Sequence, residues 1–300
     1  PFVHFRFPFV RMLVRKTIFR QFVGGESLDE TMPLIEKFSS YGVETVIDYG
    51  VEAKTAGEDS FNNASKEFIA VIHKAAESRK FSFMSIKATA FMRMELMEKV
   101  DALMRRGDGF ITDRYHQAIQ GLTAAEQTEW ERAAGRFRNI CQEGARLQVG
   151  VWVDAEETWM QEPVDALTML MMEEFNKKEA YIYNTIQLYR HDRLEFLKES
   201  HRYSSHRGFV LGVKLVRGAY MEKERERAKA MNYPSPINIT KEDTDKDYNS
   251  ALEFCMNNID KIGICAGTHN EKSSLLLADL MKQKNINRSE EHTSELQSPY

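Results

Sequence analysis

Apolar runs alternate with charged amphipathic segments along most of the chain. Six runs rich in β-branched and aromatic residues predict strands, at Val43–Glu52, Phe81–Ala90, Leu147–Asp154, Ala180–Tyr189, Gly208–Val216 and Ile262–Thr268. The segments between them have helical spacing, and the clearest are Ser60–Arg79, Val164–Asn176, Arg193–Glu199, Met221–Met231, Asp245–Asn258 and Glu271–Lys284. Alternation of strands and helices is typical of a parallel sheet with right-handed crossovers. We therefore predict an α/β protein.

Polar side chains stand at the end of each predicted strand. They are Asp48, Lys87, Asp154, Gln187, Lys214 with Arg217, and Thr268 with His269. One polar strand end is ordinary, because strand ends meet water. A series on successive strands favours a (β/α) barrel, whose strands direct their carboxyl ends to one ligand-binding mouth.

The segment Lys214–Tyr220, which reads Lys-Leu-Val-Arg-Gly-Ala-Tyr, carries the richest chemistry. It leads from an apolar strand into a charged helix. Gly218 allows a flat ligand to approach the backbone. The two cations suit an anionic substrate or a cofactor that gains negative charge. The alternative is a plain strand-to-helix turn.

The span Met92–Arg146 is too long for a simple crossover. Its charge and spacing predict a solvated helical insertion with a loop near Arg105–Asp113. Asp108 and Asp113 resemble a calcium loop only faintly, because the regular spacing of acids is absent.

Composition narrows the class of protein. The chain has 300 residues, 42% of them apolar, and a net charge of −4. It is long enough for one large domain, and it lacks the basic field and aromatic platform of a nucleic-acid-binding protein. Its cysteines, Cys141, Cys255 and Cys265, are odd in number and lack metal-site spacing, which fits a reduced intracellular setting. No apolar stretch approaches the roughly 20 residues of a membrane span.

The two ends of the chain differ from its body. Residues 1–40 predict an N-terminal helical segment, in which Pro1–Arg20 contains basic residues and no acid. We expect it to pack on the body, and the alternative is an amphipathic helix lying on a membrane. Residues 288–300 predict a disordered tail that resembles a reading frame of a sequencing adapter. Residues 41–287 then form a partial barrel with about six of eight strands.

Several motifs occur in the order found in proline dehydrogenases, which the span Thr17–Ile286 resembles. They are Gln21–Glu26, Val153–Trp159, Asn184–Tyr189, Lys214–Glu222, Tyr233–Ile237, Thr244–Tyr248 and Thr268–Glu271. The resemblance implies a distorted (β/α)8 barrel that binds FAD and oxidises L-proline to Δ1-pyrroline-5-carboxylate. It also implies a membrane quinone as electron acceptor. The expected location is cytoplasmic with peripheral membrane contact, or the mitochondrial inner membrane in a eukaryote.

The resemblance assigns a role to each polar strand end. Asp154 and Lys214 take the catalytic positions, although Asp154 could also be a helix N-cap and many relatives have arginine in place of Lys214. Lys87 would bind the substrate carboxylate, unless it is a solvated strand end, and Tyr220 would form a wall of the proline pocket. The residues expected to hold FAD are Ala155, Gln187, Arg217, Gly218, Ala219, Thr268 and His269. No metal site is expected.

One family feature is absent from the sequence. The paired arginines that clamp the substrate carboxylate have no match here, since Arg105 and Arg106 lie in the insertion. We therefore expect the chain to be nearly inactive. One alternative is an aldolase that uses Lys214 or Lys87 as a Schiff-base nucleophile. Another is a non-catalytic protein that binds flavin.

Overall fold

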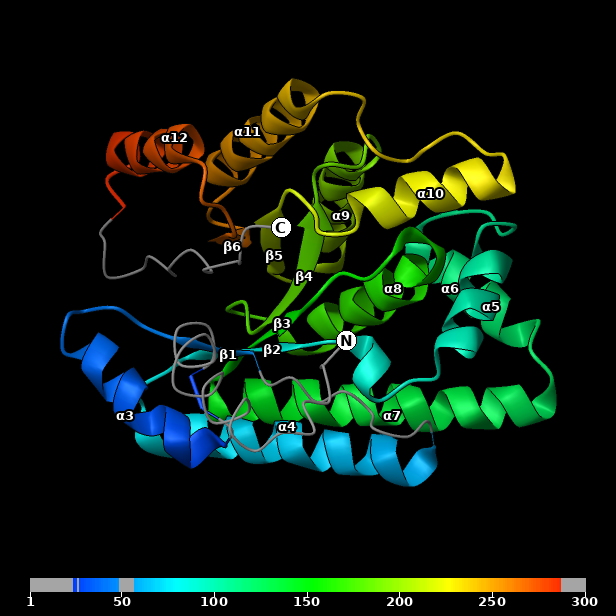
Figure 1. The fold of residues 1–300 in the computed structure, drawn as a ribbon, viewed down its shortest axis with the longest axis horizontal. Coiled ribbons are helices and arrows are strands. Elements are labelled where there is room, and N and C mark those ends of the chain that lie inside the picture. Colours follow the sequence, from blue (N-terminus) through cyan, green and yellow to red (C-terminus); the bar gives the residue numbers. More distant parts are fainter. Residues whose placement is uncertain (1–23, 26, 49–56, 287–300) are drawn as a thin grey trace, which may run out of the picture.

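The computed structural model describes residues 24–25, 27–48 and 57–286. Within them lies a single sheet of six strands, all paired in parallel and ordered as in the sequence (Figure 1). The strands are β1 Val46–Asp48, β2 Phe83–Ile86, β3 Gly150–Val153, β4 Ile182–Gln187, β5 Leu211–Val216 and β6 Ile262–Ala266. Each predicted strand run contains one of them. The prediction of an α/β protein is confirmed.

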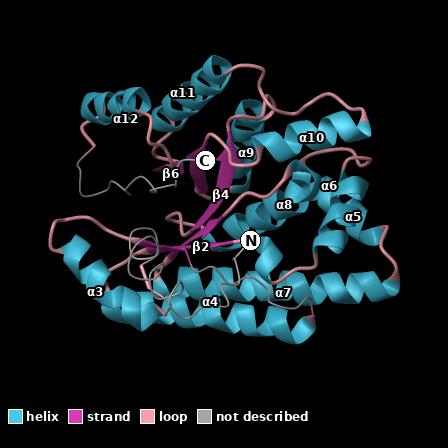
Figure 2. Cartoon of the chain, viewed as in Figure 1, coloured by secondary structure: helices cyan, strands magenta, loops and turns pink. Residues whose placement is uncertain are grey.

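Helices follow the strands and cover one face of the sheet (Figure 2). The described helices are α3 Leu28–Ser39, α4 Glu58–Ser78, α5 Met94–Met104, α6 Ile111–Gln120, α7 Ala124–Leu147, α8 Thr158–Phe175, α9 Arg193–Arg207, α10 Met221–Met231, α11 Lys241–Asn257 and α12 Glu271–Gln283, with the short 3-10 helix η2 at Ala88–Ala90. Helices α4 and α7 run side by side, and α5 and α6 pack against α8. The helical insertion predicted after Met92 is therefore present as α5, α6 and α7.

The strands are shorter than predicted because helix ends and turns take the flanking residues. Leu147 ends α7, and Gln148 adopts a left-handed conformation with φ of 57° before β3 begins. Gly208 likewise ends α9 with φ of 73°, so that β5 starts at Leu211. After Ile86 the chain turns into η2. The predicted extension of β1 past Asp48 lies outside the described residues.

Helices α8 and α9 extend furthest beyond their predicted bounds. Helix α8 begins at Thr158 instead of Val164 and contains Pro163. Helix α9 continues to Arg207, whereas the predicted segment ended at Glu199. The weak apolar periodicity of the second half of α9 explains why the sequence pattern missed it. The N-terminal helical segment is represented by α3, and residues 1–23 and 287–300 lie outside the described residues.

The calcium-loop alternative in the insertion is wrong. Asp113 lies in the first turn of α6, and its carboxylate accepts a hydrogen bond of 3.2 Å from the Phe110 backbone N–H. It is therefore a helix-capping residue. Asp108 lies in the preceding turn, where its backbone bonds to the Gln117 side chain. No group of His, Cys, Asp and Glu side chains among the described residues could hold a metal ion.

The two faces of the sheet carry different side chains. In a parallel sheet, paired residues point to the same side. One face packs on the helices and contributes to the main apolar core. The other bears the aromatic cluster of Phe83, Trp152 and Tyr183, with ring centroids 5.1 Å apart for Phe83–Trp152 and 5.8 Å for Phe83–Tyr183. We call this the inner face.

The inner face also buries polar atoms. Ser85 Oγ, Trp152 Nε1 and Thr185 Oγ1 are buried and have no hydrogen-bond partner among the described residues. Buried polar groups in proteins are nearly always hydrogen-bonded, so such a gathering marks a surface suited to a polar ligand or water. Each of these atoms belongs to a residue two positions before a polar strand end, which is Lys87, Asp154 or Gln187.

Cys141, Cys255 and Cys265 are all buried. Burial raises the pKa of the Cys141 and Cys255 thiols above their ordinary range. Across the described part of the chain, no helix combines the length and apolar character that crossing a bilayer requires.

Glu224 of α10 fixes the start of α8. Its carboxylate is fully buried and accepts hydrogen bonds from the Thr158 backbone N–H and hydroxyl, each of 2.7 Å. Glu224→Ala should destabilise the chain by about 3 kcal/mol, because two buried donors lose a charged acceptor. Urea unfolding would measure this. The exposed Glu222 of the same helix is the control, and Glu222→Ala should change stability by less than about 0.5 kcal/mol. Equal effects would contradict the capping role.

Candidate active site at the carboxyl ends of the strands

A buried ion pair occupies the centre of the site. The Lys214 ammonium lies 2.9 Å from the Asp154 carboxylate, and Lys214 is only 2% exposed. Lys214 lies within β5, on the inner face between Thr185 and Cys265, so it is not at the strand end as the sequence suggested. Its ammonium also lies 5.1 Å from the centroid of the Trp152 ring. A desolvated pair of this kind keeps both charges fixed in space.

Asp154 is held by the backbone around it. It directly follows β3, and its N–H donates to the Ile86 carbonyl of β2 at 2.8 Å. The N-cap of α8 is Glu157, so the alternative that Asp154 caps this helix is wrong. Lys87 directly follows β2 and is exposed at the start of η2. The structure thus places Lys87 and Asp154 on neighbouring strand ends.

The loop after Asp154 meets the end of β4. Gln187 is the last residue of β4 and is 2% exposed. Its Nε2 donates to the Glu156 carbonyl at 3.0 Å. Because an amide has two N–H groups and a carbonyl oxygen, this bond leaves capacity for a ligand. Ala155 lies in the same loop and is nearly buried.

Arg217 has more protein contacts than predicted. Its guanidinium donates to Asp245 at 2.7 Å, to Thr268 Oγ1 at 2.6 Å and to Ser273 Oγ at 3.0 Å. It also lies 4.4 Å from the centroid of the Tyr248 ring. The side chain therefore joins the ends of β5 and β6 to α11 and α12. The Arg217 guanidinium could contact a cofactor only while it also binds these protein partners. Otherwise the contact has to come from the Arg217 backbone.

Gly218 is required by its surroundings. Its φ is +134°, a conformation that L side chains rarely adopt. A Cβ atom here would lie 2.3 Å from the Tyr189 ring. Ala219 is exposed beside it. Tyr220 starts α10, and burial, together with Glu156, Glu157 and Asp154, raises its pKa above the ordinary range. Its phenol is thus neutral and close to the acids of the β3–α8 loop.

Thr268 and His269 follow β6. Thr268 accepts the Arg217 bond and a second hydrogen bond of 3.0 Å from the Asn270 backbone N–H. Asn270 in turn caps α12 through the Ser273 N–H. His269 is exposed at the rim. Arg217 and Thr268, which lie on different motifs in the sequence, therefore touch directly.

Sequence reasoning missed Glu156 as a site residue. It is 4% exposed, and its carboxylate accepts a hydrogen bond of 2.8 Å from the Thr89 hydroxyl. Burial raises its pKa to about 7. The sequence shows an acid, Glu156, directly after Ala155. It could not show whether this carboxylate is buried in the site or is an exposed charge in the first turn of a helix.

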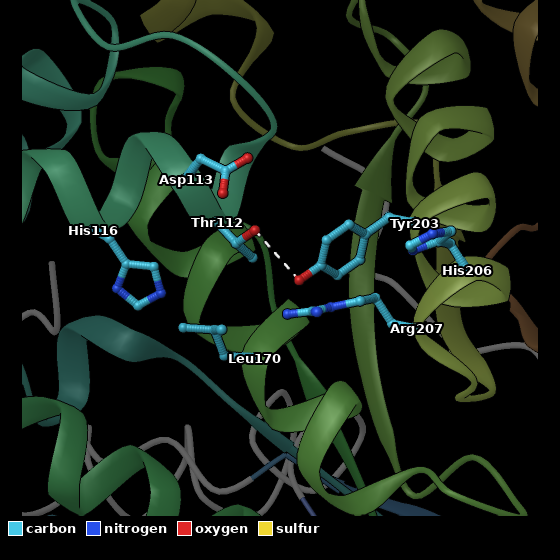
Figure 3. A pocket seen from close by; sticks show the side chains of 7 residues that line it. All are labelled: Thr112, Asp113, His116, Leu170, Tyr203, His206 and Arg207. Atoms are coloured by element: carbon cyan, nitrogen blue, oxygen red, sulfur yellow. Dashed lines mark hydrogen bonds between the residues drawn. The ribbon is translucent and has the colours of Figure 1, made fainter.

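A separate cavity lies outside this site. It has a volume of about 300 Å³ and is lined by Thr112, Asp113, His116, Leu170, Tyr203, His206 and Arg207 (Figure 3). These residues belong to α6, α8 and the last turns of α9. The carboxyl ends of strands lead into the first turns of the helices that follow, so the end of α9 lies at the opposite end of the sheet from Lys214. The cavity is not part of the candidate active site.

Comparison with known proteins gives the family. The sequence model of the family described as proline dehydrogenase matches residues 31–298. The chain belongs to the proline dehydrogenase family. Proline dehydrogenase 1, mitochondrial, of Dictyostelium discoideum is 30% identical over 92% of this chain and 53% of its own length. The carbapenem antibiotics biosynthesis protein CarD of Pectobacterium carotovorum is 31% identical over 85% of this chain and 62% of its own length.

One solved structure resembles this chain in its fold. Proline utilization A of Bdellovibrio bacteriovorus superposes with a TM-score of 0.75 at 20% identity, over 94% of this chain and 29% of that one. At this identity the likeness concerns the fold, and it confirms the TIM-like barrel class predicted from the strand ends. The chain spans about half to two thirds of the length of the curated relatives named here. Several eukaryotic relatives carry the word mitochondrial in their names.

Proposed function

We propose that this chain carries the barrel of an FAD-dependent dehydrogenase that oxidises L-proline to Δ1-pyrroline-5-carboxylate. The observation that carries the proposal is the buried Lys214–Asp154 pair, with Gln187 and Lys87 on neighbouring strand ends of a proline dehydrogenase family member. Residues 41–287 are proposed to form the catalytic barrel, with residues 288–300 outside it.

The residues present fit a flavin. A flavin ring is flat, has a pyrimidine edge with donors and acceptors, and becomes more negative on reduction. The inner face offers the unpartnered atoms of Ser85, Trp152 and Thr185. Gly218 lets the backbone after β5 pack closely on the Tyr189 ring. Flavin, when bound, supplies the acceptor for a hydride. We infer that Ala155, Gln187, Arg217, Gly218, Ala219, Thr268 and His269 hold it.

The remaining roles follow from charge and position. Asp154 keeps the Lys214 ammonium in place, and that fixed positive charge would stabilise negative charge on a bound flavin. Lys87 binds the substrate carboxylate from the neighbouring strand end. Tyr220 closes the proline pocket as a neutral wall and helps to exclude water. A membrane quinone is the proposed electron acceptor, with peripheral contact to a membrane that is mitochondrial if the source is eukaryotic.

The aldolase alternative is weaker on this geometry. A Schiff-base lysine must reach its neutral amine form to attack a carbonyl. The Asp154 carboxylate at 2.9 Å instead stabilises the ammonium of Lys214. Borohydride trapping of Lys214 with a carbonyl substrate would favour the aldolase after all.

The test is an anaerobic absorbance spectrum of the purified chain with FAD, before and after addition of L-proline. We expect the chain to retain FAD and the flavin band to shift when proline binds. Because the paired arginines are absent from the sequence, we expect little bleaching, and robust turnover would contradict that expectation. Failure to retain FAD, or a spectrum that proline does not change, would overturn the proposed function.

A further inference from the structure

Glu156 has contacts that reach three elements around the site, η2, α8 and β4. Its carboxylate accepts from Thr89 in η2, and its carbonyl accepts from Gln187 of β4. Its backbone N–H donates to Gln161 of α8 at 2.6 Å. The Gln161 amide is itself held by the buried Asp165 at 2.7 Å. Glu156 thus ties the turn that carries Lys87 to the strand end that carries Gln187.

The groups around Glu156 act on its pKa in opposite directions. Burial is the main cause that raises its pKa to about 7, and the neighbouring Glu157 raises it further. The Thr89 hydrogen bond and the Lys87 ammonium lower it. The other cations nearby are directed to other acids, since Lys214 faces Asp154 and Lys223 faces Glu157 at 2.9 Å each. Tyr220 faces the same loop as a neutral phenol.

We propose that Glu156 is a positioning residue that takes up a proton when a carboxylate binds at Lys87. The inference rests on the proposed role of Lys87. An anion that engages the Lys87 ammonium cancels the charge that favours the ionised Glu156. The Glu156 carboxylate is then left with the charge of Glu157 and of the ligand, so its protonated form is stabilised. If ligand binding favours protonation of Glu156, protonation must favour ligand binding to the same extent. The chain with Glu156 protonated therefore binds the carboxylate more tightly.

The sign of the pH dependence follows. The fold raises the pKa of Glu156 from its ordinary value of 4.5 to about 7. The stability that its protonated form contributes is therefore fully present below pH 4.5 and is lost as the pH rises through about 7. Carboxylate affinity should therefore fall as the pH rises above about 7. The steepest fall that one proton permits is about tenfold per pH unit.

The probe is cyclopentanecarboxylate, which has the ring and carboxylate of proline without the amine proton. It is added to the full chain loaded with FAD, in weakly buffered solution with a pH indicator. At pH 7 we expect uptake of about half a proton per bound ligand, because a group with a pKa near 7 starts half protonated. Glu156→Gln keeps an oxygen for Thr89 but cannot ionise, so it should bind the probe without proton uptake.

Glu157→Gln is the matched control, because it removes a carboxylate from the same loop, and it should leave most of the uptake. Undiminished uptake in Glu156→Gln would overturn the inference and leave the proposed function standing, as would binding to the unchanged chain without any uptake. Failure of the probe to bind to the FAD-loaded chain, or equal binding to Lys87→Met, would overturn the inference together with the substrate role of Lys87.

Discussion

Gly218→Ala is expected to destabilise the chain by roughly 2–6 kcal/mol and to abolish retention of FAD. The residue has φ of +134°, and holding an L side chain in such a region costs of order 1–3 kcal/mol. The added Cβ would also lie 2.3 Å from the Tyr189 ring, which must move. Overpacking of this kind typically adds about 1–3 kcal/mol. Displacement of Tyr189 would change the end of β4 beside Gln187.

Gly208→Ala is the matched control for this effect. Gly208 also has a positive φ, of +73°, but nothing lies within 4 Å of the position that an added Cβ atom would take there. It ends α9 at the far end of the sheet from the candidate site. We expect a loss of about 1 kcal/mol and full retention of FAD. Urea unfolding and flavin absorbance after gel filtration measure both properties. Similar losses in the two variants would show that the contact with Tyr189 has no special cost.

The sheet was predictable because its strands are buried on both faces. The runs around Val151 and around Val213, for example, are continuously apolar. Segments with helical periodicity lie between such runs. The ends of elements were not predictable from pattern alone. Gln148 and Gly208 stop helices through left-handed backbone conformations, and Ala88–Ala90 turns away from the sheet although two of its three residues are alanines. These features depend on local geometry that apolar content does not reveal.

The candidate site was predictable to the level of strand ends. Asp154 and Lys214 are 60 residues apart in the sequence and form one ion pair in the structure. The sequence assigned both to the mouth, but it could not show that Lys214 lies within β5 or that the two charges touch. Register between strands decides both points, and it follows from packing of the whole sheet.

Contacts between distant helices were beyond sequence reasoning. Glu224 is one of several acids in the charged run of α10, and only its burial against Thr158 distinguishes it from Glu222. The same holds for Arg217, whose partners Asp245 and Ser273 come from two later helices. A charged helix has the same sequence pattern whether all of its charged side chains are solvated or one of them is buried.

Asp154→Ala is expected to cost the chain about 3 kcal/mol and to abolish the shift of the flavin band that proline causes. The substitution removes the carboxylate that faces the buried Lys214 ammonium. Removal of one member of a buried ion pair typically costs about 3–5 kcal/mol, because the other charge stays desolvated. The exposed pair of Arg146 and Glu143 provides the control. Arg146→Ala should cost less than about 1 kcal/mol.

The double variant Asp154→Ala with Lys214→Met separates folding from chemistry. Methionine fills much of the lysine volume without charge, and replacement of a buried ion pair by apolar groups is often neutral or stabilising. We therefore expect the double variant to recover most of the stability in urea unfolding while proline still fails to shift the flavin band. If the double variant stayed as unstable as Asp154→Ala, the cost would come from lost packing at Asp154. If it regained the shift of the flavin band, the pair would have no part in the response to proline, and its charge would serve the fold alone.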